Sequence, residues 1–312
     1  MITTVTLNAS IDKAYQMASP IQGGTVMRVN NVVNSAGGKG LNVARIVTLC
    51  GEKVKATGFV GGFNGQYLED MLTKDGVEHD FTHTQSETRS CINILDERFS
   101  STEFLEPGLP VNEQEVKSFL DNFENIVKDS DVIAMSGSAP KGVPVDIYAR
   151  LTEMVKAAGK KALVDTSGEY LKAVIPSKPF MIKPNRDELE MLFKTKINSV
   201  EETIPYAQKL HEAGIDYVVI SLGEKGALLV CAEGVYHGKP PKLDIVNTVG
   251  CGDSMVGGFA VGISRGYSAE ESLKYAVAVA SANALEAKTG YIVPANRDKI
   301  YNQVEITKKS PL

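Results

Sequence analysis

The stretch NTVGCGDSMVGGF, residues 247–259, is the part of the chain around which the rest is organised. Residues 243–246 before it have the apolar pattern of a strand, and the apolar residues after it recur with the spacing of a helix. The stretch is therefore predicted to be a strand-to-helix turn. Gly250 and Gly252 let the backbone approach a ligand closely, and a helix N-terminus attracts negative charge, so an anion site is expected here.

Asp253 lies in the same predicted turn. A carboxylate beside an anion site fits a general base that takes a proton from an attacking hydroxyl, while nearby N–H groups stabilise the negative charge of a group in transfer. The alternative is that Asp253 only caps the helix and the glycines only turn the chain. The local sequence does not decide between the two interpretations.

Composition limits the classes of protein to consider. Of the 312 residues, 43% are hydrophobic, which is enough for one large α/β domain or a domain with a small appendage. A net charge of −5 argues against nucleic acid or an acidic membrane as the main partner, because both require a basic surface. The four cysteines are far apart, so reduced thiols in a cytoplasmic protein are expected rather than a zinc or redox motif. The chain has no pattern typical of a signal peptide or a membrane span.

The first strand is predicted at residues 2–7, shortly before Asp12. No G-x-G-x-x-G turn follows this strand, which argues against an NAD-dependent oxidoreductase. Asp12 lies just past the strand end, where its carboxylate could accept hydrogen bonds from substrate hydroxyls. The alternative is an Asx residue that only stabilises the turn.

A second glycine-rich turn, AGGKGLNVAR at residues 36–45, leads into a predicted helix. It is not a P-loop, because neither Ser nor Thr follows Lys39 and the upstream glycine is missing. A helix N-terminus that carries Lys39 and Asn42 suits a polyhydroxylated or phosphorylated ligand. A flexible capped turn without a ligand is the alternative.

Two β-prone segments stand outside the main pattern of the chain. We expect roughly residues 12–35 and 88–105 to form a small β-sheet that acts as a lid or dimer contact on a single domain spanning residues 1–312. Arg28 and Arg89 would both lie on this lid, where two arginines can grip a substrate phosphate. Alternatively, each arginine only solvates an exposed strand face.

From residue 112 onward helices and strands alternate, which indicates a mostly parallel sheet with helices on both faces. Polar loops directly follow four of the strands, and in a parallel sheet such loops share the carboxyl edge, where ligands bind. These loops are at 136–138, 165–168, 183–188 and 221–226. Asp12 and Asp253 would lie at the same edge. Two short antiparallel strands, a long helix over 269–287, a final helix and a loose tail complete the prediction.

Five motifs in this order together resemble the PfkB branch of the ribokinase-like sugar kinases. They are the Asn8…Asp12 turn, Gly37-Gly38-Lys39-Gly40-x-Asn42-x-Ala44, Lys183-Pro184-Asn185-x-x-Glu188, Ser221-x-Gly223-x-x-Gly226-Ala227 and Thr248-x-Gly250-x-Gly252-Asp253. Within that branch the chain is most similar to the kinases of phosphorylated ketohexoses, 1-phosphofructokinase and tagatose-6-phosphate kinase. This closer resemblance rests on the opening Thr-Leu-Asn-x-x-Ile-Asp, Arg28, Arg89 and Ser136-Gly137-Ser138-x-Pro140.

The resemblance implies a ribokinase-like α/β fold with a β-sheet lid, and transfer of the γ-phosphoryl group of ATP, with Mg²⁺, to a sugar phosphate. It makes Asp253 the general base and the backbone of Gly250, Cys251 and Gly252 the anion hole. The residues that match substrate positions are Asp12, Arg28, Gly38, Lys39, Asn42, Arg89 and Ser138. Those that match the nucleotide site are Lys183, Asn185, Ser221, Gly223, Gly226 and Asn283, and the motif that organises Mg²⁺ is matched by Asn185 and Glu188.

Two residues depart from the family pattern. Ala9 replaces the usual proline, which changes only local backbone stiffness. Cys251 replaces a smaller residue, which makes oxidation or alkylation there a hypothesis. The rival to a kinase is a sensor of the same fold that binds a sugar phosphate or nucleotide without catalysis, and the presence of Asp253 with an intact Mg²⁺ motif favours the kinase. A homodimer through the lid is left open.

Overall fold

The computed structural model describes residues 1–96 and 101–309. Its main sheet contains eleven strands in the order β15-β14-β13-β12-β11-β10-β9-β1-β4-β5, with β6 also paired to β4. The strands are β1 (Ile2–Thr6), β4 (Val54–Gly61), β5 (Glu78–His79), β6 (Thr82–Thr84), β9 (Val132–Ser136), β10 (Lys161–Asp165), β11 (Met181–Ile182), β12 (Tyr217–Ser221), β13 (Ala227–Cys231), β14 (Gly234–Lys239) and β15 (Glu305–Lys309). The three pairs β12–β13, β13–β14 and β14–β15 are antiparallel. The other strand pairs of this sheet are parallel, which confirms the mostly parallel sheet.

Helices cover both faces of the main sheet, as predicted. They are α1 (Lys39–Leu49), α2 (Gly62–Lys74), α3 (Glu113–Lys128), α4 (Ile147–Ala157), α5 (Gly168–Val174), α6 (Arg186–Phe193), α7 (Ile204–Glu212), α8 (Cys251–Ser264), α9 (Ala269–Ala284) and α10 (Pro294–Tyr301). Neighbouring side chains of a strand point to opposite faces. On β12, Val219 therefore packs in one core with α1, α8 and α9, whereas Val218 and Ile220 pack in a second core with α3, α4 and α7.

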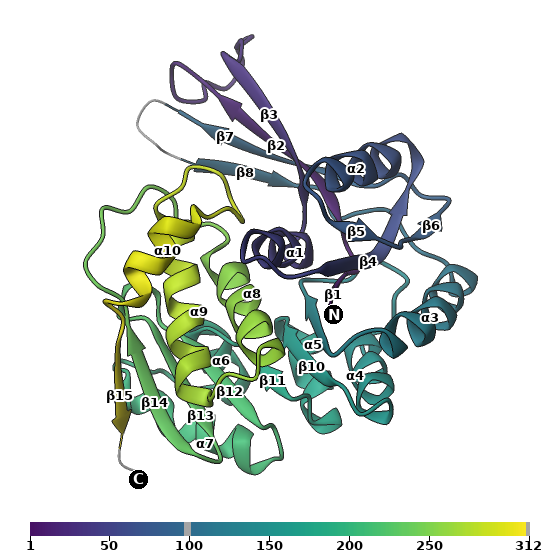
Figure 1. Ribbon diagram of the computed structural model, residues 1–312. Coiled ribbons are helices and arrows are strands. Elements are labelled where there is room, and N and C mark those ends of the chain that lie inside the picture. The colour runs from purple at the N-terminus through teal and green to yellow at the C-terminus, as the bar shows by residue number, and fades with distance from the viewer. Residues whose placement is uncertain (97–100, 310–312) are drawn as a thin grey trace.

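A separate four-stranded sheet, which we call the lid, stands apart from the main sheet (Figure 1). It consists of β3 (Asn31–Gly37), β2 (Ser10–Gln16), β7 (Arg89–Leu95) and β8 (Ser101–Leu105), in that order. Ser10 pairs with Gly37 on one side and with Arg89 on the other, so the base of the lid lies where β1 ends and where α1 begins. Residues 97–100 of the predicted lid lie outside the described residues.

Close helix packing positions the central turn. A Cβ on Gly257 of α8 would lie 2.6 Å from Cγ2 of Ile46 in α1, and one on Gly258 would lie 2.6 Å from Cα of Ala276 in α9. Since larger residues would force the helices apart, these glycines allow α8 to lie close against both neighbours. Figure 1 shows α1, α8 and α9 lying together on one side of the sheet, below the lid.

Two predictions about the C-terminal part of the chain are wrong. Residues 243–246 do not form a strand: Ile245 and Val246 are more than half exposed, and the N–H of Val246 donates to the carbonyl of Ala284 at the end of α9. The central stretch is therefore a loop-to-helix turn. The tail predicted to be loose contains β15, which pairs antiparallel with β14, while residues 310–312 lie outside the described residues.

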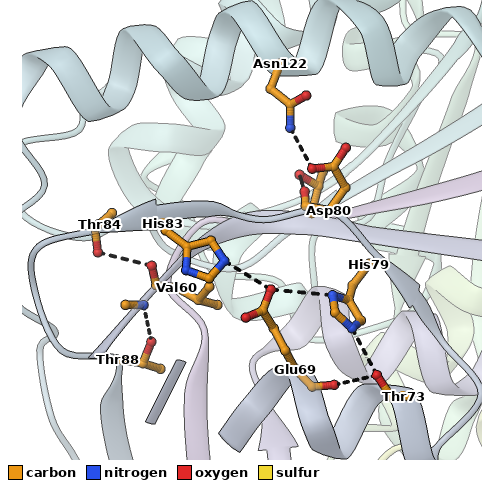
Figure 2. Close-up of polar contacts among 11 residues, drawn as sticks. Val60, Glu69, Thr73, His79, Asp80, His83, Thr84, Thr88 and Asn122 are labelled. Atoms are coloured by element: carbon orange, nitrogen blue, oxygen red, sulfur yellow. Dashed lines mark hydrogen bonds and ion pairs between the residues drawn. The ribbon is translucent and has the colours of Figure 1, made fainter. Parts of the chain in front are cut away.

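At the other end of the main sheet, polar contacts tie β5 and β6 to α2 (Figure 2). His79 Nδ1 and His83 Nε2 lie 3.5 and 3.2 Å from the same oxygen of Glu69, and Figure 2 shows both rings directed at that carboxylate.

The four cysteines of the chain carry free thiols. Among the described residues, no helix combines the length and the apolar character needed to cross a membrane.

Candidate active site

Gly250 is the N-cap of α8 and shapes the central turn. It has a φ of 81°, and a Cβ there would lie 2.7 Å from Cγ2 of Thr289 and 3.1 Å from the nitrogen of Gly290, so only glycine fits. The N–H of Cys251 reaches the carbonyl of Thr248 at 3.3 Å. No side chain of the described chain caps α8, and a helix cannot satisfy the N–H groups of its own first turn. The turn therefore presents N–H groups to an external anion.

Asp253 lies in the first turn of α8 and contacts α1. Asn42 Nδ2 donates a hydrogen bond of 2.8 Å to its Oδ2. Asp253 is 7% exposed, and this burial raises the pKa of its carboxyl to about 6, although the positive charge of Lys39 acts in the opposite direction. A carboxylate with a pKa near neutrality is suited to accept a proton. Because its hydrogen bond goes to another helix, the capping interpretation is not supported.

Two lysines and Asp165 form a charged cluster beside the turn. Asp165, at the end of β10, is buried, with its oxygens 3.2 Å from Lys183 Nζ and 3.7 Å from Lys39 Nζ. The negative charge of Asp165 raises the pKa of Lys39, which keeps that ammonium protonated. Lys183 Nζ also lies 3.4 Å from the position that a Cβ on Gly252 would occupy. The lysines thus add positive charge to the helix N-terminus.

The glycine-rich turn before α1 brings Asp12 to the base of the lid. A Cβ on Gly37 would lie 2.1 Å from the carboxylate of Asp12, and one on Gly38, which has a φ of 111°, would lie 2.7 Å from Cγ2 of Thr6. Ser10 donates a hydrogen bond of 2.7 Å to Asp12 Oδ1, and burial raises the pKa of Asp12. Gly37 therefore makes room for the half-buried carboxyl group of Asp12, and Gly38 makes room for the side chain of Thr6.

Arg89 and Ser138 both contact Asn8, which follows β1. The guanidinium of Arg89 donates to the carbonyls of Asn8 and Glu106 at 3.0 and 2.7 Å, and its buried Nε has no partner in the described chain. Asn8 Nδ2 donates to Ser138 Oγ at 3.3 Å. Arg28, in contrast, is exposed in the connection between β2 and β3, at the end of the lid opposite to its base. The structure brings Arg89 and Ser138 together but does not bring Arg28 to them.

Asn185 and Glu188 form a capping box at the N-terminus of α6. The N–H of Glu188 donates to Asn185 Oδ1 at 2.8 Å, and the N–H of Asn185 donates to Glu188 Oε2 at 2.9 Å. The charge of Glu188 contributes to the raised pKa of Lys39, so this carboxylate is electrostatically part of the same site.

The turn after β12 contains the residues predicted for the nucleotide. The N–H of Ser221 donates to the carbonyl of Pro184 at 3.1 Å, which joins this turn to the one after β11. Gly223 has a φ of 61° and faces open space. A Cβ on Gly226 would lie 1.9 Å from the carbonyl oxygen of Gly238, so packing within the sheet alone requires a glycine there.

Asn283 and Cys251 lie behind the central turn. Asn283 is fully buried, with Nδ2 donating to the carbonyl of Val249 at 3.0 Å and Oδ1 accepting from the N–H of Tyr291 at 3.2 Å. Its side chain holds the turn and presents no exposed surface to an adenine. Burial raises the pKa of the Cys251 thiol, which disfavours the reactive thiolate.

Comparison with known proteins identifies the class of this site. The sequence model of the pfkB family carbohydrate kinases matches residues 5–296. The chain belongs to the PfkB family of carbohydrate kinases. It is therefore a sugar kinase, a phosphotransferase whose acceptor is an alcohol group.

Solved structures of similar proteins agree with this assignment to the PfkB family. Phosphofructokinase-2 from Escherichia coli is 30% identical, with a TM-score of 0.91 over 97% of this chain and 98% of that chain. A possible 1-phosphofructokinase from Thermotoga maritima is 26% identical, with a TM-score of 0.87 over 99% of both chains. Ribokinase from Arabidopsis thaliana is 21% identical, with a TM-score of 0.79 over 96% of this chain and 98% of that chain, and confirms the ribokinase-like fold.

Two residues at the site were not among those predicted to act in this PfkB kinase. Asp165 pairs with both lysines, and its only signal in the sequence was its place directly after a strand. Arg45 contacts Asn42 from the next turn of α1. Its signal was the spacing of three residues from Asn42, which places both side chains on one face of a helix.

Proposed function

We propose that this sugar kinase transfers the γ-phosphoryl group of ATP to a hydroxyl of a ketohexose phosphate and yields a bisphosphate, as 1-phosphofructokinase and tagatose-6-phosphate kinase do. The observation that carries the proposal is the juxtaposition of a buried carboxylate, Asp253, with the N–H groups of its own turn and with Lys183. An acceptor for a proton and donors for a phosphoryl group are needed side by side in this reaction.

In the proposed reaction, Asp253 takes the proton of the sugar hydroxyl. The hydroxyl oxygen forms a bond to the γ-phosphorus, the bond from that phosphorus to the β,γ-bridging oxygen breaks, and ADP leaves. The N–H groups of Gly250 and Gly252, with Lys183, stabilise the charge on the equatorial oxygens of the group in transfer, and the N–H of Cys251 joins them when it leaves the carbonyl of Thr248. This division of labour makes the carboxylate a base and the turn an anion hole.

The residues present fit Mg²⁺ as a partner of the triphosphate. Within residues 1–96 and 101–309, no group of three or more His, Cys, Asp and Glu side chains is arranged to hold a metal ion. Mg²⁺ commonly uses one or two carboxylates together with phosphate oxygens and water, so such a group is not required. We propose that Glu188 and Asn185, at the N-terminus of α6, hold the ion. When bound, Mg²⁺ supplies charge neutralisation and orientation of the phosphates.

The two ends of the sugar phosphate are assigned to opposite parts of the site. Asp12, Asn42, Lys39 and the backbone of Gly38 are proposed to border the sugar, since Gly38 begins α1 next to Lys39 and Gly37 leaves space for the Asp12 carboxyl group. Arg89, with its unpartnered Nε, and Ser138 are proposed to bind the phosphate that is already present, whereas Arg28, at the far end of the same sheet, is left out of this set. The lid thus selects a substrate that carries a phosphate.

The nucleotide is assigned to the loops after β11 and β12. Ser221 and Gly223 are proposed to border the nucleotide, because Gly223 faces open space next to the turn that carries Lys183 and Asn185. Gly226 and Asn283 are proposed to shape the site from behind, through the backbone of Gly238 and the turn at Val249.

We infer a cytoplasmic location from the free thiols, which reducing compartments maintain.

The proposal is tested by measuring ADP release with Mg-ATP and, in parallel, fructose 1-phosphate, tagatose 6-phosphate and fructose 6-phosphate. We expect the highest kcat/KM with one of the first two. A preference for fructose 6-phosphate, which is bound in a structure of the E. coli protein, would retain the kinase and overturn the proposed type. Binding of a sugar phosphate and of ATP without ADP release from any substrate would favour the sensor.

We also propose that two copies pair through their lids. Val33 on β3 and Phe104 and Leu105 on β8 are 45%, 54% and 63% exposed, which leaves apolar surface for a second copy to cover. The E. coli phosphofructokinase-2 has a tetrameric inhibited form. Light scattering of the full chain should give the mass of a dimer, and Phe104→Asp should give a monomer. A monomeric wild-type protein at micromolar concentration would contradict the proposal.

A further inference from the structure

Arg45 is a buried arginine of α1 whose guanidinium makes four contacts. Nε lies 2.9 Å from Asp75 Oδ2, Nη2 donates to the carbonyl of Ala36 at 2.7 Å, and Nη1 donates to Asn42 Oδ1 at 3.2 Å and to the carbonyl of Thr289 at 3.5 Å. The residue is 3% exposed. These contacts join the end of α2, strand β3 of the lid and the loop behind the central turn to a single side chain.

The contact with Asn42 fixes the orientation of its amide group. Because Arg45 can only donate hydrogen bonds, the group that Asn42 turns toward it must be the acceptor, Oδ1. Nδ2 then faces Asp253 and donates to its carboxylate at 2.8 Å. The reversed amide would set donor against donor at Arg45 and acceptor against acceptor at Asp253. A hydrogen bond from Asn42 to Asp253 therefore follows from the presence of the guanidinium.

The surrounding backbone limits the freedom of this pair. A Cβ on Gly290 would lie 2.9 Å from Asn42 Oδ1 and 3.1 Å from Arg45 Nη1. The nitrogen of Gly290 is in turn 3.1 Å from the position of a Cβ on Gly250, the N-cap of α8. The side chains of Arg45 and Asn42 are thus packed against the same loop that supports the anion hole.

We propose that Arg45 is a positioning residue for phosphoryl transfer: it holds the Asn42 amide in the one orientation that donates to Asp253, and so fixes the carboxylate that receives the substrate proton. The inference rests on the proposed role of Asp253 as the base. A buried arginine that only stabilised the fold would affect unfolding without affecting the properties of Asp253, and this difference makes the proposal testable.

The charged groups that face Asp253 define what the loss of Arg45 should change. They are Lys39 on α1, Asp165 at the end of β10 and Lys183 after β11. The Asn42 hydrogen bond, like the two lysines, lowers the pKa of Asp253. When the amide is free to rotate, this hydrogen bond is lost for part of the time, so the pKa of Asp253 rises and the carboxylate is less well placed.

Arg45→Met is the test variant and Arg265→Met is its matched control. Arg265 makes the same two kinds of contact, to a carboxylate oxygen of Glu52 at 2.7 Å and to the carbonyl of Cys50 at 2.8 Å, but it does not contact Asn42. We expect Arg45→Met to lower kcat by on the order of tenfold, to leave the KM for ATP within about twofold, and to move the acidic limb of the pH profile to higher pH. Arg265→Met should leave kcat and the pH profile unchanged.

A double-mutant cycle with Asn42→Ala separates positioning from a general weakening of the fold. If Arg45 acts through Asn42, adding Arg45→Met to Asn42→Ala should change kcat by less than about twofold. Full multiplication of the two effects, or a wild-type kcat and pH profile in Arg45→Met, would overturn the inference. Arg45→Leu, which likewise cannot donate a hydrogen bond to Asn42, replaces the Met variant in the same cycle if circular dichroism shows that the latter does not fold, and is judged by the same two criteria.

The proposed role of Asp253 is examined separately with Asp253→Asn. Loss of turnover in Asp253→Asn with normal turnover in Arg45→Met would leave the base assignment intact and remove only the positioning role. Retained turnover in Asp253→Asn would remove the base assignment itself, whatever Arg45→Met does.

Discussion

Asn42 Nδ2 and Asp253 Oδ2 are joined by a hydrogen bond of 2.8 Å between residues 211 positions apart. One residue lies in the first turns of α1 and the other in the first turn of α8, and each helix follows a glycine-rich turn. The contact thus brings the two glycine-rich turns of the sequence to one place. It also explains how a carboxylate that is almost fully buried is kept in a fixed position.

The pH dependence of activity should reflect the ionisation of the Asp253 carboxyl group. Burial raises its pKa to about 6 in the free protein, and only the ionised form can take a proton. We therefore expect kcat/KM to be constant above this pH and to fall about tenfold per pH unit well below it. The phosphate of the substrate also ionises near pH 6. Asn42→Ala distinguishes the two ionisations. Loss of the Asn42 hydrogen bond should shift the part of the pH profile that depends on Asp253 to higher pH, and should leave the part that depends on the substrate phosphate unchanged.

Asp253→Asn should make the protein more stable at neutral pH. The pKa of Asp253 is about 6 in the folded protein, against 3.8 for an exposed aspartate carboxyl, so the folded state binds the proton more tightly. The stability that this group contributes is present below about pH 4 and is lost as pH rises through 6. Removal of the charge should raise the free energy of unfolding at pH 7.5 by roughly 1–3 kcal/mol, as measured by urea denaturation. If the variant were less stable than the wild type at pH 7.5, or if its gain in the free energy of unfolding were as large at pH 4, the claim that Asp253 is charged and buried at neutral pH would be contradicted.

Much of the architecture could be predicted because it depends on local patterns. Alternating helices and strands require a parallel sheet, and the polar residues after each strand then meet at one edge, as Asp165 and Lys183 do. Residues 243–246 misled the prediction because β-branched residues favour strands only where a partner strand exists. Strand β15 was missed because an edge strand needs little apolar character, and Glu305–Lys309 is mostly charged or polar.

The environment of the base could not be read from the sequence. A single arginine in a helix is usually exposed, so the sequence gives no indication that Arg45 is buried, yet only 3% of this residue is exposed. Two of its four contacts come from residues 30 and 244 positions away, Asp75 and Thr289. The resemblance assigns Asn283 to the nucleotide site, but its buried amide joins the central turn, at Val249, to the loop after α9, at Tyr291.

Gly250→Ala should damage the anion hole, and Gly266→Ala provides the matched control. Both glycines have positive φ, 81° and 73°, and they flank the same helix. A Cβ on Gly250 would overlap Thr289, whereas one on Gly266 would meet nothing within 4 Å. Both variants should lose about 1 kcal/mol from backbone strain, but only Gly250→Ala should also lower kcat by about 100-fold. Equal kcat values in the two variants would argue against a role of the turn in catalysis.

Arg89→Ala should weaken binding of the sugar phosphate selectively. Two of its nitrogens hold the carbonyls of Asn8 and Glu106, and its Nε, which has no partner in the described chain, is the proposed donor to a phosphate oxygen. We expect the KM for the sugar phosphate to rise by about 10- to 100-fold and the KM for ATP to stay within about twofold. Initial rates at varied concentrations of each substrate measure both values. An unchanged KM for the sugar phosphate would show that Arg89 only braces the base of the lid.

The most direct test of the central claim is the turnover of Asp253→Asn with saturating Mg-ATP and sugar phosphate at pH 7.5, alongside its affinity for ATP measured by calorimetry. The amide has the shape of the carboxyl group and can still accept the hydrogen bond from Asn42, but it cannot take the substrate proton. We predict that kcat falls by about 10²- to 10⁴-fold while the affinity for ATP is unchanged. A variant that turns over at the wild-type rate would contradict the account of this site.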